Sequence, residues 1–184
     1  MSTLRAAGRA RQAGFTLIEM LVALTIAGVL ASMAAPSFRD LIVSTRLSNY
    51  ASGLMSSAMV ARAEAIRRNA VVTMCVSSNG ASCGTGGWEQ GWLVMCRSTD
   101  LAYCDPAGTG TLVIQAQGPI AGGYKATEAA GQAAIAFDPS GSSAAAALLT
   151  VCRATPSVVT TQRQVRISAT GRPQLSKTTA STCG

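Results

Sequence analysis

The chain has 184 residues, which is enough for one modest globular domain and a short additional segment. Apolar residues make up 48 % and charged residues 12 %, a composition that excludes an intrinsically disordered chain. Aromatic residues are only 4 %, so we expect a thin β domain with short core side chains. The formal net charge is +7, and the sequence contains no histidine.

The chain begins with a basic segment, residues 1–14, that contains Arg5, Arg9 and Arg11. Residues 15–36 follow as a nearly uninterrupted apolar run, and about 20 apolar residues are enough for a helix to cross a bilayer. Basic residues before such a helix keep its amino end in the cytoplasm. We therefore predict a single-pass membrane helix at 15–36 and one domain at 37–184 on the far side of the membrane. In a bacterium these are the inner membrane and the periplasm.

Two features distinguish this start from a secretory signal. A secretory signal carries its cleavage site after the apolar run, whereas the small residue Gly14 precedes it, so that cleavage there leaves the helix on the mature protein. Glu19 is the single charged residue inside the run. A carboxylate at that depth is costly and indicates a functional partner; a shallow Glu19 that reaches the lipid headgroups is the alternative.

The segment Gly14-Phe15-Thr-Leu-Ile-Glu19 resembles the processing site of type IV prepilins and of type II secretion pseudopilins. The resemblance implies that a prepilin peptidase cuts after Gly14 and methylates the new terminal residue, Phe15. It also implies an assembly role for Glu19. In a filament its carboxylate can neutralise the terminal ammonium of a neighbouring subunit, so that two buried charges pair. Pro36 lies where pilins have a proline near the end of the apolar segment.

Residues 37–69 keep a helical period. Small or aliphatic residues recur at steps of four and three, which places them on one face: Leu47, Ala51, Leu54, Ala58, Ala61 and Ala65. These side chains are short, so a sheet can approach the helix closely. We predict one continuous helix from Phe15 to about Asn69.

After Asn69 the apolar period drops to two, which favours strands. Six runs fit: residues 70–77, 91–95, 111–117, 134–137, 147–152 and 158–168. Turn signals separate them at 78–80, 85–87, 105–108, 138–141 and 170–173. One long helix followed by short strands predicts an α+β domain with an antiparallel sheet around the carboxyl half of the helix. The resemblance likewise implies the type IV pilin fold. Residues 144–147 fit either a strand extension or a helical turn.

The six cysteines lack the spacing of a zinc site, so we predict three disulfides and an oxidising compartment. The spacing C-x7-C occurs twice, and such pairs can close hairpin loops. The last pair is distant and ties down the carboxyl terminus. The predicted bridges are Cys75–Cys83, Cys96–Cys104 and Cys152–Cys183.

Later motifs are similar to those of the GspH/FimT group of minor pilins and pseudopilins: residues 62–66, Trp88 to Trp92, and Arg163 to Pro173. In competence-related members a Gly-Arg-x-Arg turn binds DNA. Gly171 and Arg172 match that turn, and Gln174 replaces its second arginine. The resemblance thus implies DNA binding, which Gln174 is expected to weaken. No aromatic residue lies among the candidate contacts, so we expect this binding to be independent of the DNA sequence.

The candidate DNA contacts lie in a tail with no acidic residue: Arg163, Arg166, Arg172 and Lys177. Strand alternation places Val165 and Ile167 in the core and Arg166 outward. It places Arg163 on the core side, so that a bulge is needed to expose it. The alternative is a solvated basic face without a ligand.

No catalytic site is expected. Within the sequence there is no histidine, no G-x-S-x-G, no P-loop and no paired carboxylates, and no metal or cofactor is expected. We predict a minor pilin, a structural subunit of the tip complex that primes a type IV pilus. The expected partners are other pilins, the prepilin peptidase and the inner-membrane assembly platform. A type II secretion pseudopilin is the alternative.

Overall fold

A computed structural model describes residues 14–97, 104, 111–155, 160–180 and 182–183, without the side chains of residues 34–37, 39, 97, 111 and 160. The predicted leader before Gly14, the turn at 105–108, the side chain of Pro36 and residues 158–159 lie outside the described residues. The chain divides into two compact units, Met1–Leu41 and Ile42–Gly184.

The helix α1 extends without interruption over Leu17–Arg68, which confirms the predicted continuous helix. It ends in a Schellman motif, because Asn69 adopts a positive φ of 50° and the Ala70 N–H donates to the Ala65 carbonyl. Asparagine tolerates this left-handed conformation better than most residues. Among the described residues, no helix combines the length and the apolar character that a membrane crossing requires.

The carboxyl half of α1 carries the predicted core stripe. All six residues of the stripe are at most 1 % exposed, so the predicted face is confirmed. They join one apolar cluster with residues from the strands of both sheets, among them Met74, Phe137 and Val165. Four of the six are alanines, and their small volume brings the strands close to the helix backbone.

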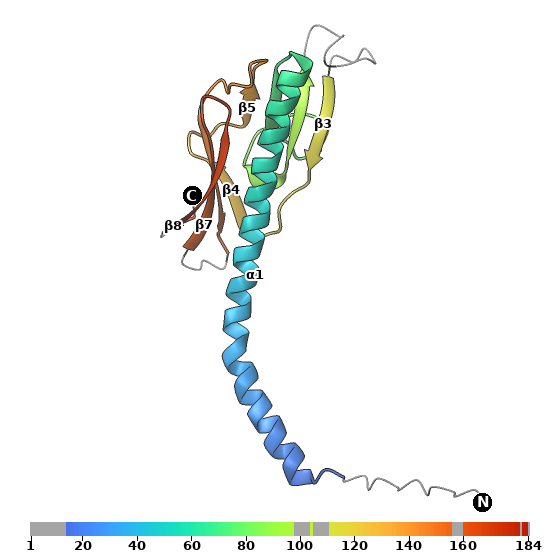
Figure 1. Cartoon of the computed structure of the whole chain (residues 1–184), viewed down its shortest axis with the longest axis vertical. Helices are drawn as coiled ribbons and strands as arrows, with labels where there is room; N and C mark the ends of the chain where they lie inside the picture. The colour runs from blue at the N-terminus through green and yellow to red at the C-terminus, as the bar shows by residue number, and fades with distance from the viewer. Residues whose placement is uncertain (1–13, 98–103, 105–110, 156–159, 181, 184) are drawn as a thin grey trace, which may run out of the picture. The chain divides into compact units, whose positions relative to one another are not determined.

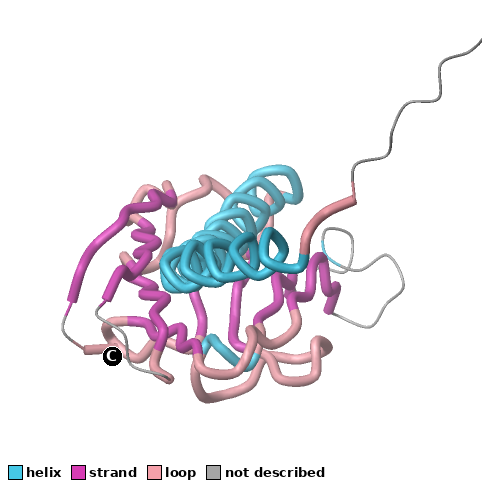
Figure 2. The backbone as a smooth tube through the Cα atoms, turned by 90° about the horizontal axis from the view of Figure 1, so that it is seen from below, coloured by secondary structure: helices cyan, strands magenta, loops and turns pink. Residues whose placement is uncertain are grey.

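Two four-stranded antiparallel sheets pack against one face of this half of α1 (Figures 1 and 2). The first sheet has the order β3-β2-β1-β5, with strands Thr111–Gln117, Trp92–Arg97, Val72–Val76 and Ala134–Phe137. The second has the order β4-β6-β7-β8, with strands Tyr124–Glu128, Ala147–Arg153, Thr160–Ile167 and Pro173–Ala180. A short 3-10 helix, η1 (Trp88–Gln90), precedes β2.

Six of the eight strands match the predicted runs, and the expectation of one sheet is wrong. The strands β4 and β8 were not predicted, because their sequences YKATE and PQLSKTTA are mostly polar. The edge strand β8 is largely exposed and pairs with β7 from Ile167↔Pro173 to Thr160↔Ala180. Residues 144–146 form no helix, and β6 begins at Ala147.

Buried polar groups fix the sheets to α1 and to the loops. The indole Nε1 of Trp92 donates to the Ser57 hydroxyl of α1 at 2.9 Å inside the core. The Trp88 indole donates to the Gln132 carbonyl at 3.0 Å. The buried Glu128 carboxylate accepts the backbone N–H groups of residues 130, 132 and 148. These bonds satisfy groups that would otherwise be costly to bury.

Three disulfides join the pairs that the cysteine spacing predicts: Cys75–Cys83, Cys96–Cys104 and Cys152–Cys183. The first two bridges close separations of 8 residues, and the last closes 31 residues. The last bridge connects β6 to the segment after β8, so it fastens the exposed edge of the second sheet.

We expect the Cys152–Cys183 bridge to contribute most to stability, because a longer loop restricts the unfolded chain more. The chain-entropy model gives about 3.7 kcal/mol for this loop and about 2.5 kcal/mol for Cys75–Cys83. Urea unfolding of the two double Cys→Ser variants, followed by tryptophan fluorescence, measures both losses. A Cys75–Cys83 variant as destabilised as the Cys152–Cys183 variant would contradict this order.

Candidate functional site

The amino terminus of α1 forms a capping motif around Glu19. The Thr16 hydroxyl accepts the Glu19 backbone N–H at 3.3 Å. The four-residue pattern Thr-Leu-Ile-Glu is that of a capping box. In this motif the side chain of the fourth residue can accept the backbone N–H of the first residue. A carboxylate in the first turn is stabilised by the helix dipole as well. Glu19 therefore has a local role in addition to the predicted intermolecular one.

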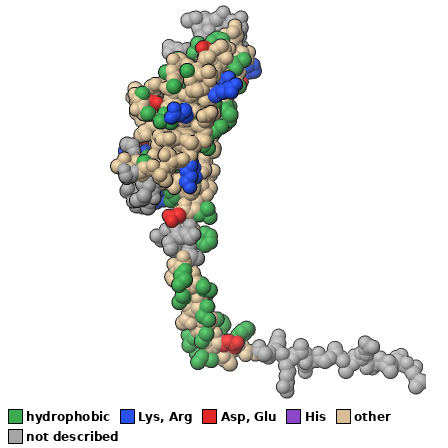
Figure 3. All heavy atoms as spheres, turned by 60° about the vertical axis from the view of Figure 1, so that its left-hand side comes forward, with side chains coloured by type: hydrophobic (Ala, Val, Ile, Leu, Met, Phe, Trp, Pro, Cys, Tyr) green, Lys and Arg blue, Asp and Glu red, His purple; other side chains and the backbone are tan. Residues whose placement is uncertain are grey.

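Large apolar side chains are exposed along the described part of the helix around Glu19, and Figure 3 shows them on one face. The exposed large residues between Phe15 and Met33 are Phe15, Leu17, Ile18, Met20, Leu21, Val22, Leu24, Ile26, Val29, Leu30 and Met33. A contiguous apolar surface of this extent marks a surface that another protein or a lipid phase covers. A helix that is apolar all round is suited to burial among other helices.

Arg163 faces the helix, as strict strand alternation requires. The β7 register with β6 and β8 has no bulge at this position. The guanidinium donates to the hydroxyl groups of Ser48 at 3.1 Å and Ser44 at 3.2 Å, both on α1. Arg163 is thus half-buried and connects the second sheet to the helix, so the bulge that would expose it is absent.

The four predicted cations do not line one edge of the sheet. Lys177 lies directly opposite Arg163 and shares its face, while Arg166 lies opposite Gln174 on the other face. Arg172 lies in the turn between β7 and β8. The four candidate DNA contacts are therefore divided between the two faces of β7 and β8 and the turn that joins these strands, and DNA binding stays a prediction from the sequence. On the face in Figure 3 the Lys and Arg side chains are likewise spread apart.

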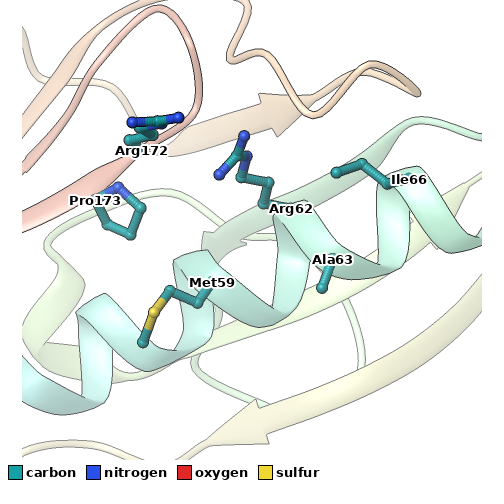
Figure 4. Close-up of a pocket in the computed structure, with 6 residues that line it drawn as sticks. All are labelled: Met59, Arg62, Ala63, Ile66, Arg172 and Pro173. Atoms are coloured by element: carbon teal, nitrogen blue, oxygen red, sulfur yellow. The ribbon is translucent and has the colours of Figure 1, made fainter.

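Arg172 instead borders a hollow between this turn and α1, which we name the turn pocket (Figure 4). It has a volume of about 450 Å³ and is lined by Met59, Arg62, Ala63, Ile66, Arg172 and Pro173. Arg62 donates through Nε to the Gly141 carbonyl at 3.0 Å, which attaches the turn between β5 and β6 to the helix.

Two glycines bring the turns together at this point. Gly171 has a φ of 72°, and a Cβ there would collide with the Gly141 carbonyl oxygen. Gly141 has a φ of 80°, and its Cβ would approach Ile66 Cδ1 to 2.7 Å. Gly171 is therefore required for its backbone conformation and for the close approach of two backbones, and Gly141 for its backbone conformation. The Gly171-Arg172 dipeptide places a guanidinium beside the helix.

The carboxylates near the turn pocket are already hydrogen-bonded elsewhere. Glu64 pairs with Arg67 and Arg68, and the hydrogen bond from Arg67 lowers the pKa of its carboxyl group. Asp138 Oδ1 accepts bonds from Ser140 and Ser142 within its own turn, and the Ser140 hydroxyl lowers the pKa of that carboxyl group. Both groups are therefore ionised and engaged at neutral pH.

Sequence reasoning did not identify Thr16 as a cap, Arg62 as a turn anchor or Glu128 as a loop acceptor. The capping pattern at 16–19 was a readable signal. The contact of Arg62 with Gly141 spans 79 residues, so no local pattern could reveal it. Among the described residues, no group of His, Cys, Asp and Glu could hold a metal ion.

Two family models match the chain. The model described as type II transport protein GspH matches residues 51–171, more than half of the chain. The prokaryotic N-terminal methylation motif matches residues 9–35, which include the Gly14-Phe15 junction and Glu19.

Two crystal structures of one minor pilin share the fold. The type IV minor pilin FimU of Pseudomonas aeruginosa is similar with a TM-score of 0.54 at 18 % identity, over 77 % of this chain and 97 % of FimU. A second crystal form of FimU gives a TM-score of 0.54 at 16 % identity, over 74 % of this chain and 99 % of FimU. The minor pseudopilin EpsH from the type 2 secretion system of Vibrio cholerae gives a TM-score of 0.49 at 12 % identity, over 73 % of this chain and 97 % of EpsH.

The GspH match over most of the folded domain, the methylation motif at its start and the shared fold lead to one assignment. The chain belongs to the GspH family and is a pilin-like subunit of the minor pilin and pseudopilin class.

Proposed function

We propose that this chain is a minor subunit of a type IV pilus, located in the complex that primes assembly at the tip. The observation that carries this proposal is the apolar surface around Glu19 at the start of α1. Because Glu19 is the only charged residue from Phe15 to Ser37, lateral packing of such helices brings it into an apolar environment. There it needs a cation, and the terminal ammonium of a neighbour supplies one.

The proposed route to the filament passes through the inner membrane. A prepilin peptidase cuts after Gly14 and methylates Phe15, and residues 15–36 hold the subunit in the membrane until an assembly platform inserts it. Three arginines before Gly14 support a cytoplasmic amino terminus. Three disulfides support a periplasmic domain, since such bonds persist in oxidising compartments.

A pseudopilin of a type II secretion system is the second candidate. The description of the matching family model names type II transport and supports it. The structural match to the minor pilin FimU covers nearly all of that protein and supports the type IV pilus as the machine. We favour the pilus because the three disulfides and the basic carboxyl-terminal segment suit a subunit exposed outside the cell.

We expect the mature protein to begin at Phe15 and to carry an N-methyl group. Removal of residues 1–14 leaves the complete α1 helix on the subunit, which the proposed assembly requires. Intact-mass measurement of protein recovered from sheared filaments checks the terminus. An intact Met1, or a terminus beyond Ala35, would remove the basis of the proposal.

We expect Glu19→Gln and Glu19→Ala to reduce incorporation into filaments by at least about tenfold, since each removes the partner of a buried ammonium. Glu19→Gln keeps a capping-box side chain, so it separates the charge from the helix cap. The subunit content of sheared filaments, relative to the membrane fraction, is the measurement. Formation of the three disulfides serves as the folding control. Normal incorporation of Glu19→Gln would show that the carboxylate charge is not needed.

Deletion of the gene distinguishes the two machines. We expect the deletion strain to lose surface pili while it secretes its extracellular enzymes at the normal level, and complementation to restore the pili. Pilus counts by electron microscopy and enzyme activities in the culture supernatant measure both outcomes. Normal pili together with a secretion defect would establish the pseudopilin alternative instead.

A further inference from the structure

The helix α1 has a second stripe that the core does not use. Met59, Arg62, Ala63 and Ile66 follow one another at helical spacing and form the helix side of the turn pocket. Met59 is 46 % exposed and Ile66 is 50 % exposed, although both are large and apolar. The turn pocket therefore has an apolar floor that the folded domain leaves open.

Two guanidinium groups border this floor without an opposite charge. Arg62 and Arg172 make no ion pair with any described residue. Among the described residues, the Arg62 side chain makes one hydrogen bond, from Nε to the Gly141 carbonyl. Glu64 and Asp138, the nearby carboxylates in the chain, are engaged with other donors. Figure 4 shows Arg62 reaching from the helix toward the turn that carries Arg172.

We propose that the turn pocket binds a carboxylate side chain, flanked by an apolar residue, from a different subunit of the same filament. The proposal rests on the proposed function, because it assumes that the chain packs against other subunits. Guanidinium groups bind carboxylates through paired, charge-assisted hydrogen bonds. The side chains of Met59, Ile66 and Pro173 offer an apolar contact beside them.

A protein carboxylate fits this pocket better than a DNA duplex does. A duplex presents a row of phosphates and is held by several cations along one surface. Here only Arg62 and Arg172 border the pocket, while Arg166 lies on the outer face of β7 and Lys177 on the face of Arg163. An apolar floor also contributes nothing to phosphate binding.

A different subunit fits better than a second copy of this chain, because this chain has few carboxylates to offer. Four of its described carboxylates accept hydrogen bonds within the molecule: Glu64, Glu89, Glu128 and Asp138. Of the described acidic residues, only Glu19 and Asp40 lie exposed without such a bond through the side chain. The proposed cleavage removes Arg5, Arg9 and Arg11, so the net charge falls from +7 to +4. A subunit that is still basic is complemented by an acidic partner.

The test places an amine where the guanidinium lies. In Arg172→Lys the charge is kept, and a water-soluble carbodiimide joins the new amine to a carboxylate in direct contact. The full-length gene carrying Arg172→Lys is expressed in the host, and sheared filaments are treated with the reagent. Few other cross-links from this chain are expected, since Lys125 and Lys177 are its only natural lysines. We expect a cross-linked peptide that joins position 172 to an Asp or Glu of another subunit.

The matched control is Arg166→Lys, which introduces the same amine on the outer face of β7 and is expected to give no specific cross-link. Adding Arg62→Gln to Arg172→Lys should lower the yield about two- to fivefold, as expected for the loss of one charged partner. Raising the salt concentration should lower it as well. Disulfide formation and presence in the filament show that each variant is folded.

The outcomes separate the pocket from the proposed function. Filaments that contain the Arg172→Lys protein but give no cross-link at position 172 overturn the pocket proposal and leave the filament role intact. A cross-link to Glu19 or Asp40 of a second copy overturns the choice of a different subunit. A cross-link yield at position 172 that Arg62→Gln does not change, but that duplex DNA abolishes, identifies phosphate as the occupant. That outcome also overturns the proposal. Absence of the unsubstituted chain from all filaments is a failure of the proposed function itself.

Discussion

The close approach of two sheets to one small-sided helix face is the constraint on which the rest of this structure depends. Four alanines in the α1 stripe are completely buried, so the strands of both sheets reach one common apolar cluster. Larger residues there would force the sheets outward, and overpacking of this kind costs about 1–3 kcal/mol. The Trp92 indole packs beside Gly53 and donates to the Ser57 hydroxyl. One face of α1 is thereby fully occupied, and its other faces remain available for different contacts.

Those other faces explain how the cations of this chain are arranged. Arg163 and Arg62 both extend between a sheet or turn and α1, and both donate to uncharged oxygen atoms. They act first as ties between elements that are distant in the sequence. The Gly171-Arg172 dipeptide has a structural reason as well, because only glycine lets this turn rest on the Gly141 carbonyl. Its arginine then borders an open apolar hollow, which is a different setting from a continuous basic track.

Glu19 combines a local role at the start of α1 with the intermolecular role that we propose for it. The Thr16 hydroxyl and the Glu19 backbone define the first turn, and the carboxylate lies near the positive end of the helix dipole. A helix that begins in a fixed way presents this carboxylate in a fixed position. A fixed position suits the proposed pairing, because the Glu19 carboxylate is surrounded by apolar side chains and has to meet one terminal ammonium of a neighbouring subunit. Substitutions at Glu19 therefore have to separate capping from charge before they report on assembly.

The sequence by itself determined the continuous helix, its buried alanine stripe, six strands, three disulfides and the pilin-like start. Each of these follows from a period, a spacing or a motif within a short stretch of chain. Only the tertiary structure decided the division into two sheets, the inclusion of the polar strands β4 and β8, and the absence of a bulge at Arg163 together with its contacts to Ser44 and Ser48. The pairing of β8 with β7 and the contact of Arg62 with Gly141 join residues whose local patterns carry no sign of each other. Such contacts are selected by the close packing around α1, which depends on the whole domain rather than on any segment of it.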